Sequence, residues 1–85
     1  MITDNTKIQV PIPSVKRFPS YLRILRQRQA EGMEYISATV LAEELNLKPI
    51  QVRKDISCTG IEGKPKVGFV ADELIDSITH VLGWD

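Results

Sequence analysis

The chain has 85 residues, of which 42% are hydrophobic and 26% are charged, with eleven basic and eleven acidic side chains. This composition is typical of one small folded domain and excludes a disordered or disulfide-rich chain. The neutral total hides an uneven distribution, because residues 14–30 contain five basic and no acidic side chains, whereas residues 69–85 contain four acidic side chains and no Lys or Arg. We therefore expect a basic side and an acidic side on the folded domain.

The sequence also bears on location. Cys58 is the single cysteine and cannot form an internal disulfide, which fits a reducing compartment. The N-terminus lacks the charged-then-apolar pattern of a secretory signal, and no apolar stretch approaches the roughly 20 residues of a membrane-spanning helix. These features predict a cytoplasmic protein or a cytoplasmic piece of one.

The first predicted elements are an arm and a long helix. Residues 1–13 contain two prolines and no clear hydrophobic period, so we expect a disordered N-terminal arm there. Ser14 is a candidate N-cap for a helix that runs to about Glu31 and is ended by Gly32. Its apolar stripe consists of Phe18, Tyr21, Leu22 and Leu25.

Two shorter helices follow a short extended segment at residues 35–36. Ser37 is suited to cap the first of them, and Asn46 is suited to end it. Pro49 at the first helical position then starts the second, which runs to about Cys58. Helix, short turn and helix between Ser37 and Cys58 form the helix-turn-helix arrangement.

Glycines at positions 60, 63 and 68 break the helical pattern after this motif. Residues 66–70 can form a strand that returns from a basic loop, and a last helix runs from about Ala71 to Gly83. We therefore predict a mainly α winged helix-turn-helix over residues 14–85, with a three-helix core, a two-stranded β-wing and a C-terminal helix. The competing reading is a plain three-helix bundle with a glycine-rich loop.

The third predicted helix has a sidedness that bears on function. Steps of 100° per residue place Val52 and Ile56 on the core face and Lys54 on the opposite face, with Arg53 at the boundary. In a helix-turn-helix this outer face enters the DNA major groove, where Gln can pair with adenine and Lys or Arg with guanine. The candidate DNA-reading residues are Ile50, Gln51, Arg53, Lys54 and Ser57.

Asp55 does not fit a DNA-binding face, because a carboxylate repels phosphate. We expect it to have a structural role and to pair with a nearby Arg. A competing interpretation treats Arg53, Lys54 and Asp55 simply as a solvated face.

The predicted wing carries two lysines. Lys64 and Lys66 flank Pro65 at the tip, where both amines could follow the minor groove or contact its phosphates. Lysines are also common at exposed turns, which is the alternative for either residue alone. Arg17, near the start of the first helix, is a further candidate for a phosphate contact. The chain shows no catalytic constellation, no metal-ligand spacing and no glycine-rich dinucleotide loop.

Three segments carry a family resemblance: RFPSYLRIL at residues 17–25, LAEELNLKPIQVRKDIS at residues 41–57, and GKPKVGF at residues 63–69. With these segments the chain, over about residues 13–83, resembles the N-terminal domain of the Rex family of bacterial redox-sensing transcriptional repressors. The resemblance implies a winged helix that binds a two-fold operator as a homodimer. Many relatives carry an Arg-Gly pair where this chain has Pro65-Lys66, and aromatic residues where it has Thr59 and Glu62.

The resemblance also implies roles for individual residues. Gln51, Arg53 and Lys54 match recognition-helix contacts, Arg17 matches a backbone contact, and Lys64 and Lys66 match wing contacts. Arg23 resembles a first-helix Arg that faces the sensing domain. In the family an NADH- or NAD⁺-binding Rossmann domain follows, which dimerises the protein and is absent from this chain, so no cofactor is expected here.

Two functions from different classes follow. The chain is expected to bind double-stranded DNA sequence-specifically for transcriptional repression, with NADH/NAD⁺ control residing outside it, and not to be an enzyme. The alternative is a winged-helix protein-docking module whose acidic last helix is the contact face.

Overall fold

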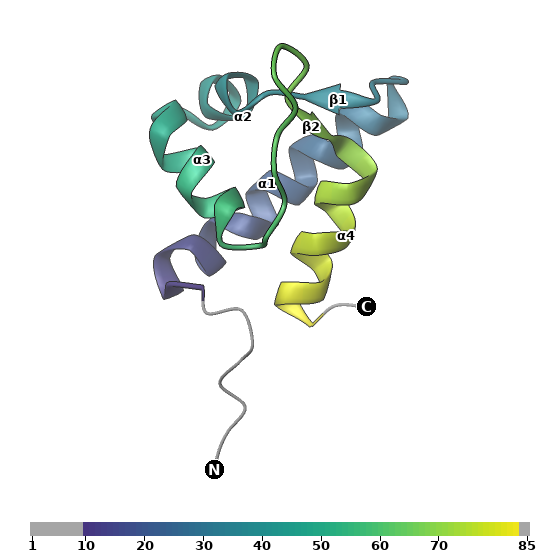
Figure 1. Ribbon diagram of the computed structural model, residues 1–85. Coiled ribbons are helices and arrows are strands. Elements are labelled where there is room, and N and C mark those ends of the chain that lie inside the picture. Colours follow the sequence, from purple (N-terminus) through teal and green to yellow (C-terminus); the bar gives the residue numbers. More distant parts are fainter. Residues whose placement is uncertain (1–9, 84–85) are drawn as a thin grey trace.

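The computed structural model describes residues 10–83, which form a small helical domain with a two-stranded sheet (Figure 1). The elements are α1 (Ile12–Ala30), β1 (Tyr35–Ile36), α2 (Ala38–Leu45), α3 (Pro49–Ser57), β2 (Phe69–Val70) and α4 (Ala71–Leu82). Helix α1 runs through the middle of the domain and packs against α4 and α2, while α2 packs against α3. No helix within the described range is long and apolar enough to cross a membrane.

Helix α1 begins earlier than the sequence suggested. It starts at Ile12 with Pro11 at the N-cap position and no side-chain cap, so the predicted cap at Ser14 is wrong. Pro13, the second residue of the helix, suits this end because the first helical N–H groups have no partner within the helix. Ser14 is instead buried and hydrogen-bonds to α3. Residues 1–9 of the predicted arm lie outside the described residues.

The helix-turn-helix forms where local signals predicted it. The Ser37 hydroxyl accepts a hydrogen bond of 3.1 Å from the Val40 N–H and caps α2. Asn46 adopts a left-handed conformation with φ of 58° and ends α2, and Pro49 opens α3 three residues later. These local interactions set the angle at which α3 leaves α2.

The sheet is shorter than expected and lies elsewhere. Strand β2 contains only Phe69–Val70, and it pairs antiparallel with β1, with Ile36 opposite Phe69. The predicted strand over residues 66–70 is therefore too long, because Lys66 and Gly68 have φ values of 73° and 92°, which no strand accommodates. A single bridge between Lys64 and Gly68 closes the wing. The winged helix-turn-helix class itself is confirmed.

One hydrophobic core joins all four helices and the sheet. Its fully or almost fully buried members on α1 are Phe18, Tyr21, Leu22, Ile24 and Leu25. Leu41 of α2, Val52 and Ile56 of α3, and Leu74 and Ile78 of α4 meet this face. This core leaves the outer face of α3 and the wing in solvent.

Candidate nucleic-acid interface

The outer face of α3 carries the predicted polar side chains. Arg53, Lys54 and Ser57 are exposed, and Ile50 keeps 58% of its surface in contact with solvent. The Ser57 hydroxyl donates 2.9 Å to the carbonyl of Arg53, so it turns back along the helix. Gln51 is only partly exposed, because its amide is drawn toward the core side of the helix.

Asp55 lies on the inner side of α3, and its carboxylate is fully buried. It accepts hydrogen bonds from Ser14 Oγ at 2.6 Å, from Arg17 Nε at 2.6 Å and from Arg17 Nη2 at 2.8 Å. The Tyr21 hydroxyl and Gln51 Nε2 also donate to it. We call these five residues the Asp55 cluster. The expected pairing of Asp55 with a nearby Arg is confirmed.

The cluster keeps its charges in place. Burial by itself raises the pKa of Asp55, but the hydrogen bonds from Arg17, Ser14, Tyr21 and Gln51 prevail and lower that pKa to about 2. The hydrogen bond to Asp55 raises the pKa of Arg17, and burial together with the same carboxylate raises the pKa of Tyr21. At neutral pH the cluster therefore contains an ionised carboxylate, a charged guanidinium and a neutral phenol.

Arg17 consequently has a role that its position in the sequence did not reveal. Its guanidinium forms an ion pair with Asp55 that joins α1 to α3, while 27% of its side chain stays exposed. The exposed part lines a shallow hollow between the start of α1 and α3, together with Gln51 and Lys54. The structure thus brings Arg17 next to two of the predicted DNA-reading residues.

The wing presents its two lysines at a tight turn. The Lys64 carbonyl accepts from the N–H groups of Val67 and Gly68, and the Lys64 N–H donates 2.7 Å to the Gly68 carbonyl. Pro65 and Lys66 form the tip, and both lysines are exposed. The positive φ of Lys66 is uncommon for a residue with a side chain.

Gly68 fixes the base of the wing against β1. A Cβ atom at this position would lie 2.6 Å from the Ile36 carbonyl oxygen and 3.0 Å from the Ser37 Cα. Only glycine permits both this approach and a φ of 92°. The wing therefore rests directly on the residue that caps α2.

A second, larger hollow lies between the wing and the helix-turn-helix. Its walls include Arg53 and Ser57 of α3, Lys64 and Lys66 of the wing, and Thr39 at the start of α2. The predicted recognition helix and the predicted wing thus face one concave surface. Sequence reasoning missed Thr39, for which no pattern signal exists.

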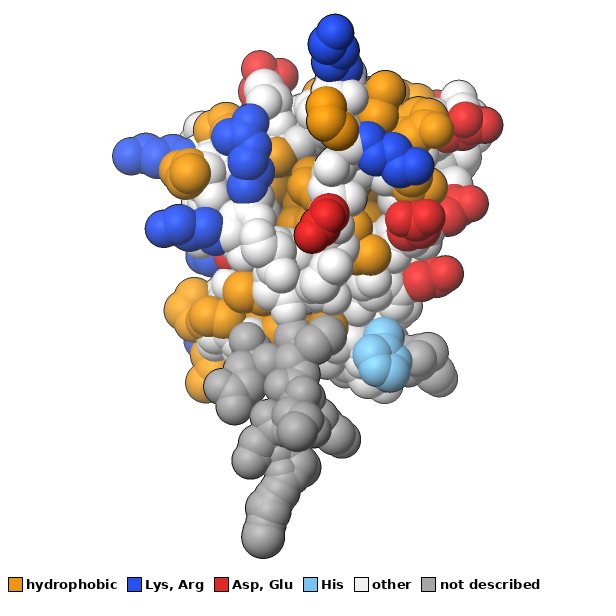
Figure 2. Space-filling view, viewed as in Figure 1, with side chains coloured by type: hydrophobic (Ala, Val, Ile, Leu, Met, Phe, Trp, Pro, Cys, Tyr) orange, Lys and Arg blue, Asp and Glu red, His pale blue; other side chains and the backbone are white. Residues whose placement is uncertain are grey.

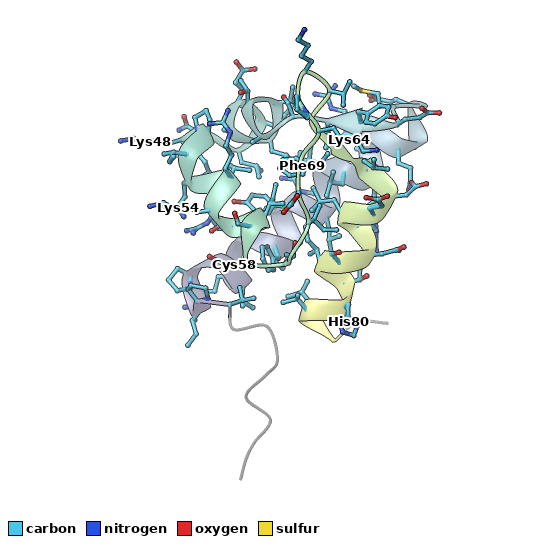
Figure 3. All side chains as sticks on the ribbon, in the orientation of Figure 1. Lys48, Lys54, Cys58, Lys64, Phe69 and His80 are labelled. Atoms are coloured by element: carbon cyan, nitrogen blue, oxygen red, sulfur yellow. The ribbon has the colours of Figure 1, made fainter. Side chains whose placement is uncertain are left out.

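Lys48 is another residue that sequence reasoning missed. It occupies the N-cap position of α3 and is exposed. Figure 3 shows Lys48 and Lys54 extending from the same side of the helix, away from the core. The sequence did offer a signal for it: Lys48 directly precedes Pro49, the first residue of the predicted helix, so it could have been expected at the exposed start of that helix.

Charge is unevenly distributed over the face seen in Figure 2. Lys and Arg side chains gather over α3 and the wing, whereas the acidic side chains lie mostly over the side formed by α4 (Figure 2). Asp72, Glu73 and Asp76 of α4 are all exposed. Arg23 is exposed on α1 and lines neither hollow. Among residues 10–83 no three His, Cys, Asp or Glu side chains are grouped to bind a metal ion.

Comparison with known proteins agrees with this geometry. Residues 9–57 match the family model described as "Putative DNA-binding protein N-terminus". The chain is 55% identical over 80 residues to the redox-sensing transcriptional repressor Rex of Treponema denticola, covering 93% of this chain and 38% of that protein. It is 41% identical over 75 residues to Rex 1 of Thermotoga maritima, covering 88% of this chain and 36% of that protein.

A solved structure has the same fold. The crystal structure of RSP in complex with beta-NAD⁺ and operator DNA superposes with a TM-score of 0.79 at 28% identity, over 91% of this chain and 36% of RSP. A further structure, of RSP as a Rex-family repressor, gives a TM-score of 0.74. The chain spans less than two fifths of the length of these relatives. With its winged helix-turn-helix and the matched residues 9–57, the chain belongs to the family of N-terminal DNA-binding domains of the Rex repressors.

Proposed function

We propose that the chain is the operator-binding half of a redox-sensing transcriptional repressor, and that it binds double-stranded DNA sequence-specifically. The observation that supports this most directly is the concave surface shared by α3 and the wing, whose walls include Arg53, Lys64 and Lys66. An α-helix fits the major groove, and cations on a flanking loop suit the adjacent backbone or minor groove. The names of the relatives support repression as the outcome of binding.

Base reading and phosphate binding fall to different elements in this proposal. On α3, side chains of the outer face read base edges; these are the exposed Ile50, Arg53, Lys54 and Ser57 and the partly exposed Gln51. Lys66 at the wing tip and Lys64 just below it supply charge. Arg17 contacts a backbone phosphate with the part of its side chain that stays exposed. Lys48, on the same side as Lys54, adds a further cation.

Redox control resides outside this chain in our proposal. RSP was crystallised with beta-NAD⁺ and operator DNA, and we infer that NADH or NAD⁺ binds a separate domain of the whole protein. Arg23, exposed on α1 and distant in sequence from the α3 face, is the proposed contact to that domain.

The whole protein is proposed to act in the cytoplasm as a homodimer on an operator with two-fold symmetry. Two copies of α3 would then read two half-sites one or more helical turns apart. The chain itself is proposed to carry no enzymatic activity, in keeping with relatives that are named as repressors.

Titration with DNA at two ionic strengths tests the proposal. A duplex selected by the chain from a randomised library and a scrambled duplex are titrated at about 50 and about 200 mM salt, a range over which several phosphate contacts change affinity by orders of magnitude. Tighter binding to the selected duplex, with affinity that falls as salt rises, is expected. Binding that is equal on both duplexes and insensitive to salt contradicts the proposal and favours the protein-docking alternative.

A further inference from the structure

The Asp55 cluster contains one residue that faces both the core and the solvent. Gln51 lies one helical turn before Asp55, and its Nε2 donates 3.2 Å to Asp55 Oδ1. Gln51 also lines the hollow beside Arg17 and Lys54 on the outer surface. Its carboxamide therefore sits at the boundary between a buried carboxylate and the groove-facing side of α3.

An ionised carboxylate only accepts hydrogen bonds. The Asp55 carboxylate is held in its ionised form by donors from Ser14, Arg17 and Tyr21. A carboxamide next to it must therefore turn its NH₂ end toward the carboxylate, since its oxygen would meet another oxygen. The opposite end of the Gln51 amide, the oxygen, is left to face away from Asp55. A glutamine whose amide is free to rotate has no preferred orientation, since the oxygen and the NH₂ group are nearly equal in shape.

We propose that Asp55 is a positioning residue that fixes the Gln51 amide oxygen toward the DNA, so that Gln51 accepts a hydrogen bond from the exocyclic amine of an adenine or a cytosine. In the major groove these amines are donors, whereas guanine O6 and thymine O4 are acceptors. A fixed acceptor therefore discriminates between the two sets of bases. This inference rests on the proposed function, because it assigns one specificity determinant within it.

The test removes the amine from one base at a time. In the duplex selected by the chain, each adenine is replaced in turn by purine and each cytosine by 2-pyrimidinone, which lack only the exocyclic amine. At one position per half-site we expect the replacement to weaken binding about fivefold, the value of one hydrogen bond. The same replacement should change the affinity of Gln51→Ala by less than about twofold, because the acceptor is gone.

A second variant tests the positioning role of Asp55 itself. Asp55→Asn has nearly the same shape, but its side chain can present either a donor or an acceptor to Gln51. The amide of Gln51 can then reverse. Removal of the exocyclic amine should therefore weaken binding by less than about twofold instead of fivefold, while the variant still binds the selected duplex. Ser14→Ala is the matched control, because it removes a donor to Asp55 without touching Gln51. In Ser14→Ala, removal of the amine should weaken binding by the same factor as in the unchanged chain, even if the variant is less stable.

One measurement needs no variant and covers the case in which Asp55→Asn does not fold. The side-chain NH₂ of Gln51 should exchange with solvent more slowly, by NMR, than that of the exposed Gln27 in the same helical domain. Equal exchange at the two amides would show that Asp55 does not hold Gln51 and would overturn the inference.

The outcomes separate the inference from the proposed function. If the randomised library yields no preferred duplex, both fall together. If a duplex is selected but removal of the amine affects the unchanged chain and Gln51→Ala equally at every position, the inference alone is overturned. Unchanged discrimination in a folded Asp55→Asn variant overturns it as well.

Discussion

Helix α3 and the wing bring basic side chains to one concave surface, but they are held in opposite ways. Helix α3 is fixed by Val52 and Ile56 in the core and by the buried Asp55, which ties it to α1. The wing is held by a bridge between Lys64 and Gly68 and by one close backbone approach, and its tip lies in solvent. The difference suits the two proposed tasks, because hydrogen bonds to base edges need rigidly held side chains whereas phosphate attraction tolerates movement.

The largest expected effect is the loss of the carboxylate on which the rigidity of α3 depends. Asp55→Ala leaves two buried hydroxyls, those of Ser14 and Tyr21, and a guanidinium without their acceptor. We therefore expect the free energy of unfolding to fall by about 3–5 kcal/mol. Urea denaturation followed by circular dichroism measures this. Lys54→Ala, which removes an exposed side chain from the same helix, should cost less than about 0.5 kcal/mol. Similar losses in the two variants would mean that the cluster does not stabilise the joint between α1 and α3.

The wing should be most sensitive at its base. Gly68→Ala combines an unfavourable positive φ with a Cβ only 2.6 Å from the Ile36 carbonyl, so we expect a loss of about 3 kcal/mol in stability. Gly60→Ala is the matched control: its φ is 86°, but nothing lies within 4 Å of the added Cβ. It should cost only about 1 kcal/mol, from backbone strain alone. Thermal unfolding measures both, and an equal cost would show that the close approach to β1 does not matter.

Acid should destabilise the domain through the Asp55 cluster. The pKa of Asp55 is lowered from its usual value near 4 to about 2, so its contribution is complete above pH 4 and is lost as the pH falls toward 2. The stability difference between the unchanged chain and Asp55→Asn should therefore shrink by about 2 kcal/mol over this interval. Urea midpoints measured at several pH values provide the test. A difference that stays constant from pH 5 to pH 2 would contradict the assignment.

DNA binding should separate the two elements again. Lys54→Ala is expected to cost about 1–3 kcal/mol on a selected duplex and little on a scrambled one, as base contacts do. Lys64→Ala is the matched change on the wing, and it should weaken both duplexes and lower the salt slope by about one unit. Anisotropy titrations at several salt concentrations report both quantities. Equal losses on the two duplexes for Lys54→Ala would leave α3 as a phosphate clamp without base reading.

The smallest effect expected has opposite signs for stability and for binding. Lys66 has a φ of 73°, and glycine adopts this conformation without strain, so Lys66→Gly should raise stability by about 0.5–1 kcal/mol. The same change removes a cation from the tip and should weaken binding to any duplex. Differential scanning calorimetry and a salt titration on one sample measure the pair. A variant that is more stable and binds equally well would show that the tip does not reach DNA.

Local signals in the sequence were enough to predict most of the fold. Ser37, Asn46 and Pro49 cap, end and start helices through contacts with residues close to them in sequence. The helix-turn-helix could therefore be predicted from the positions of these three residues. Ser14 looked like a cap for the same local reason, but its hydroxyl is used by Asp55, 41 residues away. No periodicity reveals such a partner.

The site was predicted less completely than the fold. Helical phase identified the exposed face of α3, and the charge of Asp55 made an Arg partner plausible, yet Arg17 was assigned to DNA and not to that partner. The wing strand was too long because the residue type at position 66 gives no sign of a positive φ. The first difference arises because a tertiary contact between α1 and α3 sets the role of Arg17, and the second because a tight turn closed by the Lys64–Gly68 bridge sets the backbone of Lys66.

The way the wing is attached also has a practical consequence for engineering. Because the bridge at Lys64 and Gly68 and the contact with Ile36 lie below the tip, residues 65–67 contribute nothing to the core, and Pro65 and Lys66 are exposed. A foreign loop of different length or charge could be grafted between Lys64 and Gly68 while the recognition helix stays as it is. The domain is thus a scaffold with an exchangeable arm, on which, under the proposed function, DNA affinity could be tuned separately from base preference.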